Sequence, residues 1–276
     1  QKFVGGTSQH QYAVLGCFLG ALAAVGTLGC GLLTKERLKP VRAEKFSMHQ
    51  FVDLVKNKPW VYMTLMAICT NFFNGFRYAV AGYMFTYCMG GDITIGRLII
   101  NYTVFMAFGE VTCMIFGGVS PVVAKWLGSK RRAFMFSGIV CFVTSLIFFF
   151  IPMDPKYIWV MIGVSILTSA GIGIYSPLVW SMYADVADYA TKKNGTSSTG
   201  LIFSSGTMAQ KLGTAISGSL IAMFLGLAGA HMINDQFGNP IIDPASITDS
   251  VLQMVWALFS LFPAALALLL ILLSYL

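Results

Sequence analysis

Charged side chains are scarce in this sequence, since Asp, Glu, Lys and Arg together make up only 11% of its 276 residues. Hydrophobic residues account for 57%, and the mean hydropathy is +0.74. A water-soluble domain needs more polar and charged groups than this to cover its surface. The shortage of charge therefore excludes an ordinary soluble domain and predicts a protein that is integral to a membrane.

Patterns for catalysis and metal binding are also lacking. The three histidines, His10, His49 and His231, lie outside the long apolar runs and form no motif, and no Gly-x-Ser-x-Gly, His-Glu-x-x-His or phosphate-binding glycine loop occurs. The six cysteines show no paired spacing, so we interpret them as small apolar packing residues and expect neither a disulfide framework nor a metal site. We predict that the chain is not an enzyme and needs no cofactor.

Long apolar runs are what the sequence does contain. A helix needs about 20 apolar residues to cross the ~30 Å hydrocarbon core of a bilayer, and seven runs reach about that length. We therefore predict an all-α membrane protein with seven transmembrane helices. The predicted spans are approximately residues 12–34, 61–89, 98–119, 133–151, 157–180, 201–227 and 251–276.

Lysine and arginine residues are concentrated in alternate connections. Such residues stay on the cytoplasmic side of a membrane during insertion. The connections after the first, third and fifth spans are basic, whereas the last connection, residues 229–250, has three aspartates and no Lys or Arg. This asymmetry predicts that the N-terminus lies outside and the C-terminus in the cytoplasm. The net charge of +7 then reflects membrane topology, and we expect no nucleic-acid partner.

The longest predicted cytoplasmic connection, residues 35–60, contains an amphipathic pattern. Met48, Phe51, Val52 and Val55 repeat at i, i+3, i+4 and i+7, which favours a short helix lying at the membrane interface. A solvated basic linker fits the same residues, and the sequence leaves both interpretations open.

Three charged residues fall inside predicted spans: Arg77, Glu110 and Lys211. A charge at the bilayer centre costs at least ~2.5 to 3.5 kcal/mol on insertion scales, so it usually faces a bundle interior or a water-filled path. Counting along the helices places Lys211 and Glu110 at a similar depth, ~13 to 15 Å from the cytoplasmic side. Glu110 is thus a candidate partner for Lys211. A pair with Arg77, a partner outside this chain and a purely structural ion pair stay open.

Lys211 belongs to a polar stripe. Ser204, Thr207 and Thr214 lie on the same helical face as Lys211, at spacings close to i, i+3, i+7 and i+10. Lipid would penalise these groups, so we expect the stripe to face a polar path through the protein.

The residues before and along this stripe resemble a known family. Residues 183–189 read Tyr-Ala-Asp-Val-Ala-Asp-Tyr, and Gly-Leu-Ile-Phe-Ser at 200–204 and Lys-Leu-Gly at 211–213 follow. This pattern resembles the glycoside-pentoside-hexuronide:cation symporters, a melibiose permease-like family of the major facilitator superfamily. That family typically has an Asp-x-x-Asp/Glu-Tyr stretch before its eleventh helix and a lysine midway along it. Residues 57–60, Asn-Lys-Pro-Trp, are similar to the start of its seventh helix.

The resemblance implies a major facilitator-type bundle of twelve helices, of which this chain holds helices six to twelve. Residues 1–34 would be the last helix of the N-terminal half, residues 35–60 a cytoplasmic central linker, and residues 61–276 the C-terminal six-helix bundle. It also implies symport of a sugar or glycoside by alternating access, with Na⁺ or H⁺ held in the missing N-terminal half. We expect the protein to work as a monomer with that half, among the lipids of the bacterial inner membrane.

The same resemblance implies roles for individual residues. Lys211 matches the family lysine near the sugar and cation sites, Thr207 matches a sugar-contacting position, and the aromatic position of the tenth helix falls at Ser176, beside Tyr175. Gly206 replaces a glutamine of melibiose permease, and the position of the family's gate-closing arginine is not basic here. The predicted substrate-binding residues are Lys211, Thr207, Ser204, Tyr175, Ser176, Arg77 and Asn74; the predicted charge network is Lys211, Glu110 and Arg77; and the predicted cytoplasmic gate is Asp185, Asp188, Lys192 and Lys193.

Two other interpretations stay open from the sequence. Relatives of this fold also move lipids or other organic solutes, and tyrosines at helix ends are commonly interface anchors. A seven-helix receptor has the same predicted orientation, although the third span lacks an Asp-Arg-Tyr end and the last lacks Asn-Pro-x-x-Tyr. A cation-coupled sugar transporter accounts best for the pattern from Asp185 to Lys211.

Overall fold

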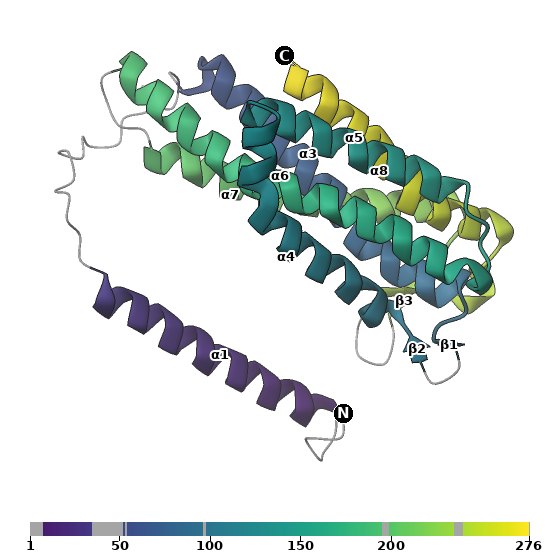
Figure 1. Cartoon of the computed structure of the whole chain (residues 1–276). Helices are drawn as coiled ribbons and strands as arrows, with labels where there is room; N and C mark the ends of the chain where they lie inside the picture. Colours follow the sequence, from purple (N-terminus) through teal and green to yellow (C-terminus); the bar gives the residue numbers. More distant parts are fainter. Residues whose placement is uncertain are drawn as a thin grey trace. The chain divides into compact units, whose positions relative to one another are not determined.

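The computed structural model describes residues 8–34, 52, 54–95, 98–194, 199–234 and 240–275. This part of the chain contains seven long helices, one at each predicted span (Figure 1). They are α1 (Ser8–Leu33), α3 (Lys58–Tyr83), α4 (Tyr102–Trp126), α5 (Lys130–Phe149), α6 (Ile158–Asn194), α7 (Thr199–Leu227) and α8 (Asp249–Tyr275). The predicted all-α class and the number of helices are confirmed.

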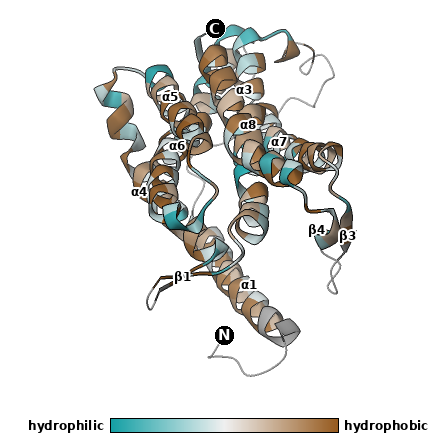
Figure 2. Ribbon diagram, turned by 90° about the vertical axis from the view of Figure 1, so that its right-hand side faces the viewer, coloured by the Kyte–Doolittle hydropathy of each residue, from teal (hydrophilic) through white to brown (hydrophobic). Residues whose placement is uncertain are grey.

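Within the described residues, six of these helices are long and apolar enough to cross a membrane, and α3 is the exception. Helix α3 carries Asn71, Asn74 and Arg77 along its second half. Hydrophobic residues, coloured brown in Figure 2, otherwise follow most of the length of the helices. A helix with polar side chains at membrane depth fits a position next to a polar interior.

The chain divides into two units, Gln1–Glu44 and Lys45–Leu276, which are described separately. In the first unit, α1 is an uninterrupted helix in which the Thr27 hydroxyl donates a hydrogen bond of 2.8 Å to the carbonyl of Ala23. The predicted domain boundaries after residues 34 and 60 stay predictions. The predicted amphipathic segment includes Met48 and Phe51, which lie outside the described residues.

In the second unit, the described helices pack as a bundle. Helix α3 contacts α7 and α8, α6 contacts α4 and α5, and α5 also contacts α8. Two glycines let neighbouring backbones approach closely. A Cβ atom at Gly213 of α7 would lie 2.6 Å from the carbonyl oxygen of Ile68 on α3, and one at Gly173 of α6 would lie 2.5 Å from that of Cys113 on α4. Small residues at these crossings let the backbones approach, as in other membrane helix pairs.

Two clusters of buried side chains fill the bundle, one toward each end. One cluster includes Phe76, Phe85, Phe105, Phe148 and Phe259. The other includes Trp60, Met66, Phe134, Tyr175 and Tyr183. We call the end of the bundle near the second cluster the basic end, because the terminal turns of α3, α4 and α5 there carry Lys58, Lys125, Lys130, Arg131 and Arg132.

Helix α6 is longer than predicted. The fifth predicted span ends near residue 180, which places residues 183–189 in the connection to the next span as a loop. This prediction was wrong, because α6 continues to Asn194. The continuation contains neither glycine nor proline, and Val186, Ala187 and Ala190 are buried at helical spacing, so packing extends the helix. Its 37 residues span ~55 Å, more than the ~30 Å hydrocarbon core, so its last turns reach beyond that core.

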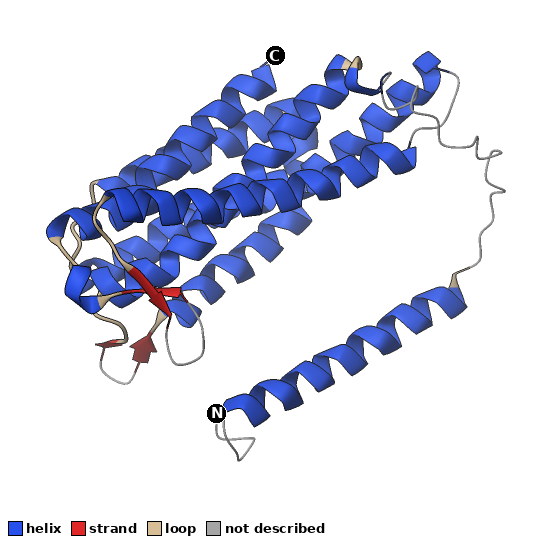
Figure 3. Cartoon of the chain, turned by 180° about the vertical axis from the view of Figure 1, so that it is seen from behind, coloured by secondary structure: helices blue, strands red, loops and turns tan. Residues whose placement is uncertain are grey.

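Two connections form short antiparallel hairpins that the sequence did not predict. Strand β1 (Ile93–Ile95) pairs with β2 (Leu98–Ile100), and β3 (Met232–Asn234) pairs with β4 (Pro240–Ile242). Figure 3 shows them at the same end of the bundle. The third span was predicted to begin at residue 98, but α4 begins only after Asn101, whose side chain accepts a hydrogen bond of 3.0 Å from the Val104 N–H and caps the helix. A π-helical turn at Met84–Cys88 and 3₁₀ turns at Pro155–Tyr157 and Pro244–Ser246 complete the described connections.

Candidate functional site

Helix α7 presents the predicted polar stripe on an exposed side. Ser204, Thr207, Lys211 and Thr214 are all exposed, whereas the opposite side of α7 packs on α3. We call these four residues the α7 polar face. The hydroxyls of Ser204 and Thr207 each donate a hydrogen bond of 2.8 Å to a carbonyl of their own helix, which leaves their oxygens free to accept.

The Lys211 ammonium group has no ion pair within the part of the chain that the structure describes. A cation in a membrane-spanning helix is costly unless water, a ligand or an opposite charge accompanies it. No acidic side chain of the described residues therefore compensates the charge of Lys211.

Arg77 of α3, in contrast, lies inside the bundle, with only 7% of its surface exposed. Its Nη2 atom donates a hydrogen bond of 3.0 Å to Ser165 Oγ on α6, and its guanidinium carbon lies 5.7 Å from the centre of the Phe259 ring on α8. One hydroxyl and an aromatic face compensate a buried guanidinium only in part. Arg77 therefore needs a counter-charge nearby.

Glu110 of α4 lines the same small cavity as Arg77, together with Tyr78, Ser165 and Ser169. The cavity has a volume of about 10 Å³, which is room for a single water molecule. The Tyr78 hydroxyl donates a hydrogen bond of 2.5 Å to Glu110 Oε1. Since no direct ion pair joins Arg77 and Glu110 in the described residues, the geometry fits a pair linked through one water molecule.

The structure thus divides the predicted charge network. Arg77 and Glu110 share a cavity, but Lys211 does not line it. Helix α7 packs mainly on α3, whereas α4 packs mainly on α6. A similar predicted depth did not identify Glu110 as the partner of Lys211, because depth says nothing about the direction in which a helix face points.

The predicted binding residues near the middle of α6 face different surroundings. Tyr175 is buried, with 2% of its surface exposed, and its hydroxyl donates a hydrogen bond of 2.9 Å to Asn74 Oδ1 on α3. Ser176 is exposed, and Asn74 is half-buried. Tyr175 and Asn74 therefore tie α6 to α3 inside the bundle, and Ser176 alone of these three lies on an exposed surface.

Within the predicted gate, Asp185 pairs with a lysine that is not among the predicted gate residues. Lys130, at the start of α5, approaches both carboxylate oxygens of Asp185 at 2.7 Å. Lys193 instead lies over the ring of Tyr189, at 5.9 Å from its centre. Asp188 and Lys192 are exposed, and neither takes part in an ion pair within the described residues.

Sequence reasoning missed Lys130 as the partner of Asp185 and Ser165 as a partner of Arg77. A three-residue turn, with Gly128 at a φ of 76° and Ser129 capping α5, brings Lys130 close to α6. The signal for Ser165 is present in the sequence. Ser165, Thr168 and Ser169 repeat at i, i+3 and i+4 within an apolar run, as polar residues on an inward face do.

A family model described as MFS/sugar transport protein matches residues 2–276. YagG of Escherichia coli (strain K12), provisionally named a glycoside/cation symporter, is 27% identical over 229 residues, which cover 80% of this chain and 46% of YagG. The uncharacterized symporter YjmB of Bacillus subtilis (strain 168) is 26% identical, over 76% of this chain and 45% of YjmB. The inner membrane symporter YicJ of Escherichia coli (strain K12) is 25% identical, over 77% of this chain and 45% of YicJ.

The chain spans about half the length of the curated relatives it matches. The family match confirms the resemblance that the pattern from Asp185 to Lys211 indicated, and it rules out the seven-helix receptor and an enzyme. The chain is that of a multi-pass membrane protein and belongs to the MFS/sugar transport protein family, with symporters of the melibiose permease-like group among its relatives.

Proposed function

We propose that the complete protein is a secondary active transporter that moves a sugar or glycoside together with Na⁺ or H⁺. Membership of a sugar transport family supports this proposal, as do relatives named as symporters. The observation that carries it is the α7 polar face, where an ammonium group without a partner in the described residues shares one exposed side of a membrane helix with three hydroxyls.

The chemistry of the α7 polar face suits a polyhydroxylated solute. Lys211 offers three N–H donors, and the Ser204 and Thr207 oxygens accept while their protons are used within the helix. A sugar hydroxyl both donates and accepts, so it can bridge the two kinds of group. Tyr175 and Arg77 are buried and Asn74 is half-buried, and we assign these three residues to the support of the bundle and to its charge balance.

The position of Lys211 also supports coupling. An ammonium group in a low-dielectric membrane interior interacts strongly with any cation or carboxylate that shares its cavity. We place the carboxylates that hold Na⁺ or H⁺ in the N-terminal half. Solute and cation then affect each other's affinity equally, because such linkage is reciprocal.

Alternating access requires the basic end of the bundle to open and close. In our proposal the basic end is the cytoplasmic end, and the N-terminus of α1 is outside. The protein works as a monomer in the bacterial inner membrane. The Lys130–Asp185 pair between α5 and α6 is at this end and contributes to the gate. The two halves would rock about the α7 polar face and expose it to each side in turn.

Uptake by proteoliposomes of the complete protein tests the proposal. Labelled hexoses, pentoses and glycosides are offered with an inward Na⁺ gradient, an inward H⁺ gradient or neither. Lys211→Ala should abolish gradient-driven uptake, Lys211→Arg should retain part of it, and Lys156→Ala, which removes an exposed lysine at the other end of the bundle, should have no effect. Solute flux that is indifferent to both gradients would refute symport, and normal uptake by Lys211→Ala would refute the assigned site.

A further inference from the structure

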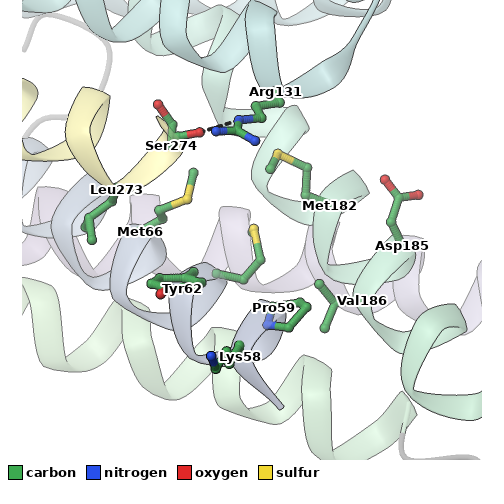
Figure 4. Close-up of a pocket in the computed structure, with 11 residues that line it drawn as sticks. Lys58, Pro59, Tyr62, Met66, Arg131, Met182, Asp185, Val186, Leu273 and Ser274 are labelled. Atoms are coloured by element: carbon green, nitrogen blue, oxygen red, sulfur yellow. Dashed lines mark hydrogen bonds between the residues drawn. The ribbon is translucent and has the colours of Figure 1, made fainter. Parts of the chain in front are cut away.

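A cavity of about 540 Å³ lies at the basic end of the bundle, among α3, α5, α6 and α8 (Figure 4). Its walls are mainly apolar and rich in methionine, a flexible side chain that adapts to irregular partners. The volume is in the range of pockets that hold small organic ligands. No residue of the α7 polar face lines this cavity, so solute binding does not account for it. The apolar lining residues are Pro59, Met63, Met66, Met182, Val186 and Leu273.

Two cationic side chains flank these apolar walls, Lys58 at the start of α3 and Arg131 at the start of α5 (Figure 4). Arg131 Nε donates a hydrogen bond of 2.6 Å to the carbonyl of Ser274 on α8, but in the described residues neither cation pairs with a carboxylate. Asp185 is the one acid in the lining, and Lys130 already neutralises it. The cavity therefore carries an uncompensated positive charge.

The position of the cavity along the helices matches a bilayer interface. Lys58 is in the first turn of α3, and Met66 lies eight residues further along, or ~12 Å deeper. Met182 and Val186 lie where α6 leaves the hydrocarbon core, because that helix is longer than the core is thick. The cations are thus at the level of lipid headgroups, and the methionine wall extends from there toward the acyl chains.

We propose that this cavity binds an anionic phospholipid, with its phosphate against Lys58 or Arg131 and an acyl chain along Met63 and Met66. A soluble anion would leave the apolar wall in contact with water, and a neutral lipid would leave two cations without a counter-charge. An anionic lipid satisfies both parts of the site. Because the walls come from four helices, a bound lipid also stabilises the arrangement in which Lys130 pairs with Asp185.

Native mass spectrometry of the complete protein in detergent measures this binding without any transport assay. Phosphatidylglycerol should bind at least about fivefold more tightly than phosphatidylcholine with the same acyl chains, since only the former carries a net negative charge. The double variant Lys58→Gln with Arg131→Gln should lose this preference. The matched control, Lys125→Gln with Lys156→Gln, removes two lysines that do not line the cavity and should keep it.

The apolar wall is tested by Met182→Trp, which fills the cavity and leaves every charge in place. This variant should lose phosphatidylglycerol binding, while inorganic phosphate at millimolar concentration should not displace the lipid from the unmodified protein. Thermal unfolding in detergent checks that each variant is folded. If Met182→Trp is not folded, Leu273→Phe replaces it as the variant that fills the cavity. Five results would each overturn the proposal. Three concern the preference: the two lipids bind equally, the double variant keeps the preference, or its control loses it. The other two are that the folded cavity-filling variant still binds phosphatidylglycerol, or that phosphate displaces the lipid. None of these results bears on symport.

Discussion

The Tyr78 hydroxyl on α3 donates a hydrogen bond of 2.5 Å to the Glu110 carboxylate on α4. Tyr78 directly follows the buried Arg77 in the sequence. This bond fastens α3 to α4 at membrane depth. It also holds the carboxylate at the one-water cavity that Arg77 lines. The two intramembrane charges are therefore positioned to compensate each other without direct contact.

Arg77 and Glu110 should be energetically coupled. Arg77→Met leaves the carboxylate without a nearby cation, and Glu110→Gln leaves the buried guanidinium without a counter-charge, so each should lower thermal stability in detergent. The double variant, Arg77→Met with Glu110→Gln, should lose less stability than the sum of the two single losses. We expect the difference to be about 0.5 to 3 kcal/mol. Asp154→Asn combined with Arg77→Met is the control and should be additive, since Asp154 belongs to an exposed connection. An additive Arg77–Glu110 cycle would show that the shared cavity does not link them.

Tyr175→Phe should separate support of the bundle from contact with solute. The substitution removes the donor to Asn74 Oδ1, so stability should fall by about 0.5 to 1.5 kcal/mol. Because Tyr175 is buried behind the exposed surface, the KM for the transported solute should change little. Thermal unfolding and uptake kinetics measure the two quantities, and Ser176→Ala, at the exposed neighbour, is the comparison. A large rise in KM with unchanged stability would assign Tyr175 to the solute after all.

The positions of the helices could be predicted from the sequence because an apolar run is a local property. The stripe from Ser204 to Thr214 could be predicted for the same reason, since helical periodicity alone places these residues on one face. The pair of Lys130 with Asp185 could not, because the residues are 55 positions apart and their contact depends on how α5 packs against α6. The continuation of α6 depends on packing as well, and three-residue strands are too short to leave a periodic signal.

The Lys130–Asp185 pair should affect transport more than stability. The two side chains are 39% and 57% exposed, and exposed ion pairs contribute at most about 1 kcal/mol, so the melting temperature of Lys130→Ala should change little. Uptake should change more, because a gate needs only a small bias between two conformations. The exchanged variant, Lys130→Asp with Asp185→Lys, should recover uptake relative to either single change. Failure of the exchange to recover any uptake would contradict a gating role for the pair.

Gly213 and Gly218 should respond in opposite directions to alanine, although both lie on α7. At Gly213 the added Cβ would lie 2.6 Å from the Ile68 carbonyl oxygen and 2.9 Å from Asn71 Cβ, so α3 and α7 must separate, at a cost of about 1 to 3 kcal/mol. At Gly218 the same atom meets nothing within 4 Å. Gly218→Ala should therefore raise stability by a few tenths to about 1 kcal/mol through the better helix propensity of alanine. Thermal unfolding of the two variants side by side measures the difference, and a Gly213→Ala protein as stable as Gly218→Ala would contradict the close crossing of α3 and α7.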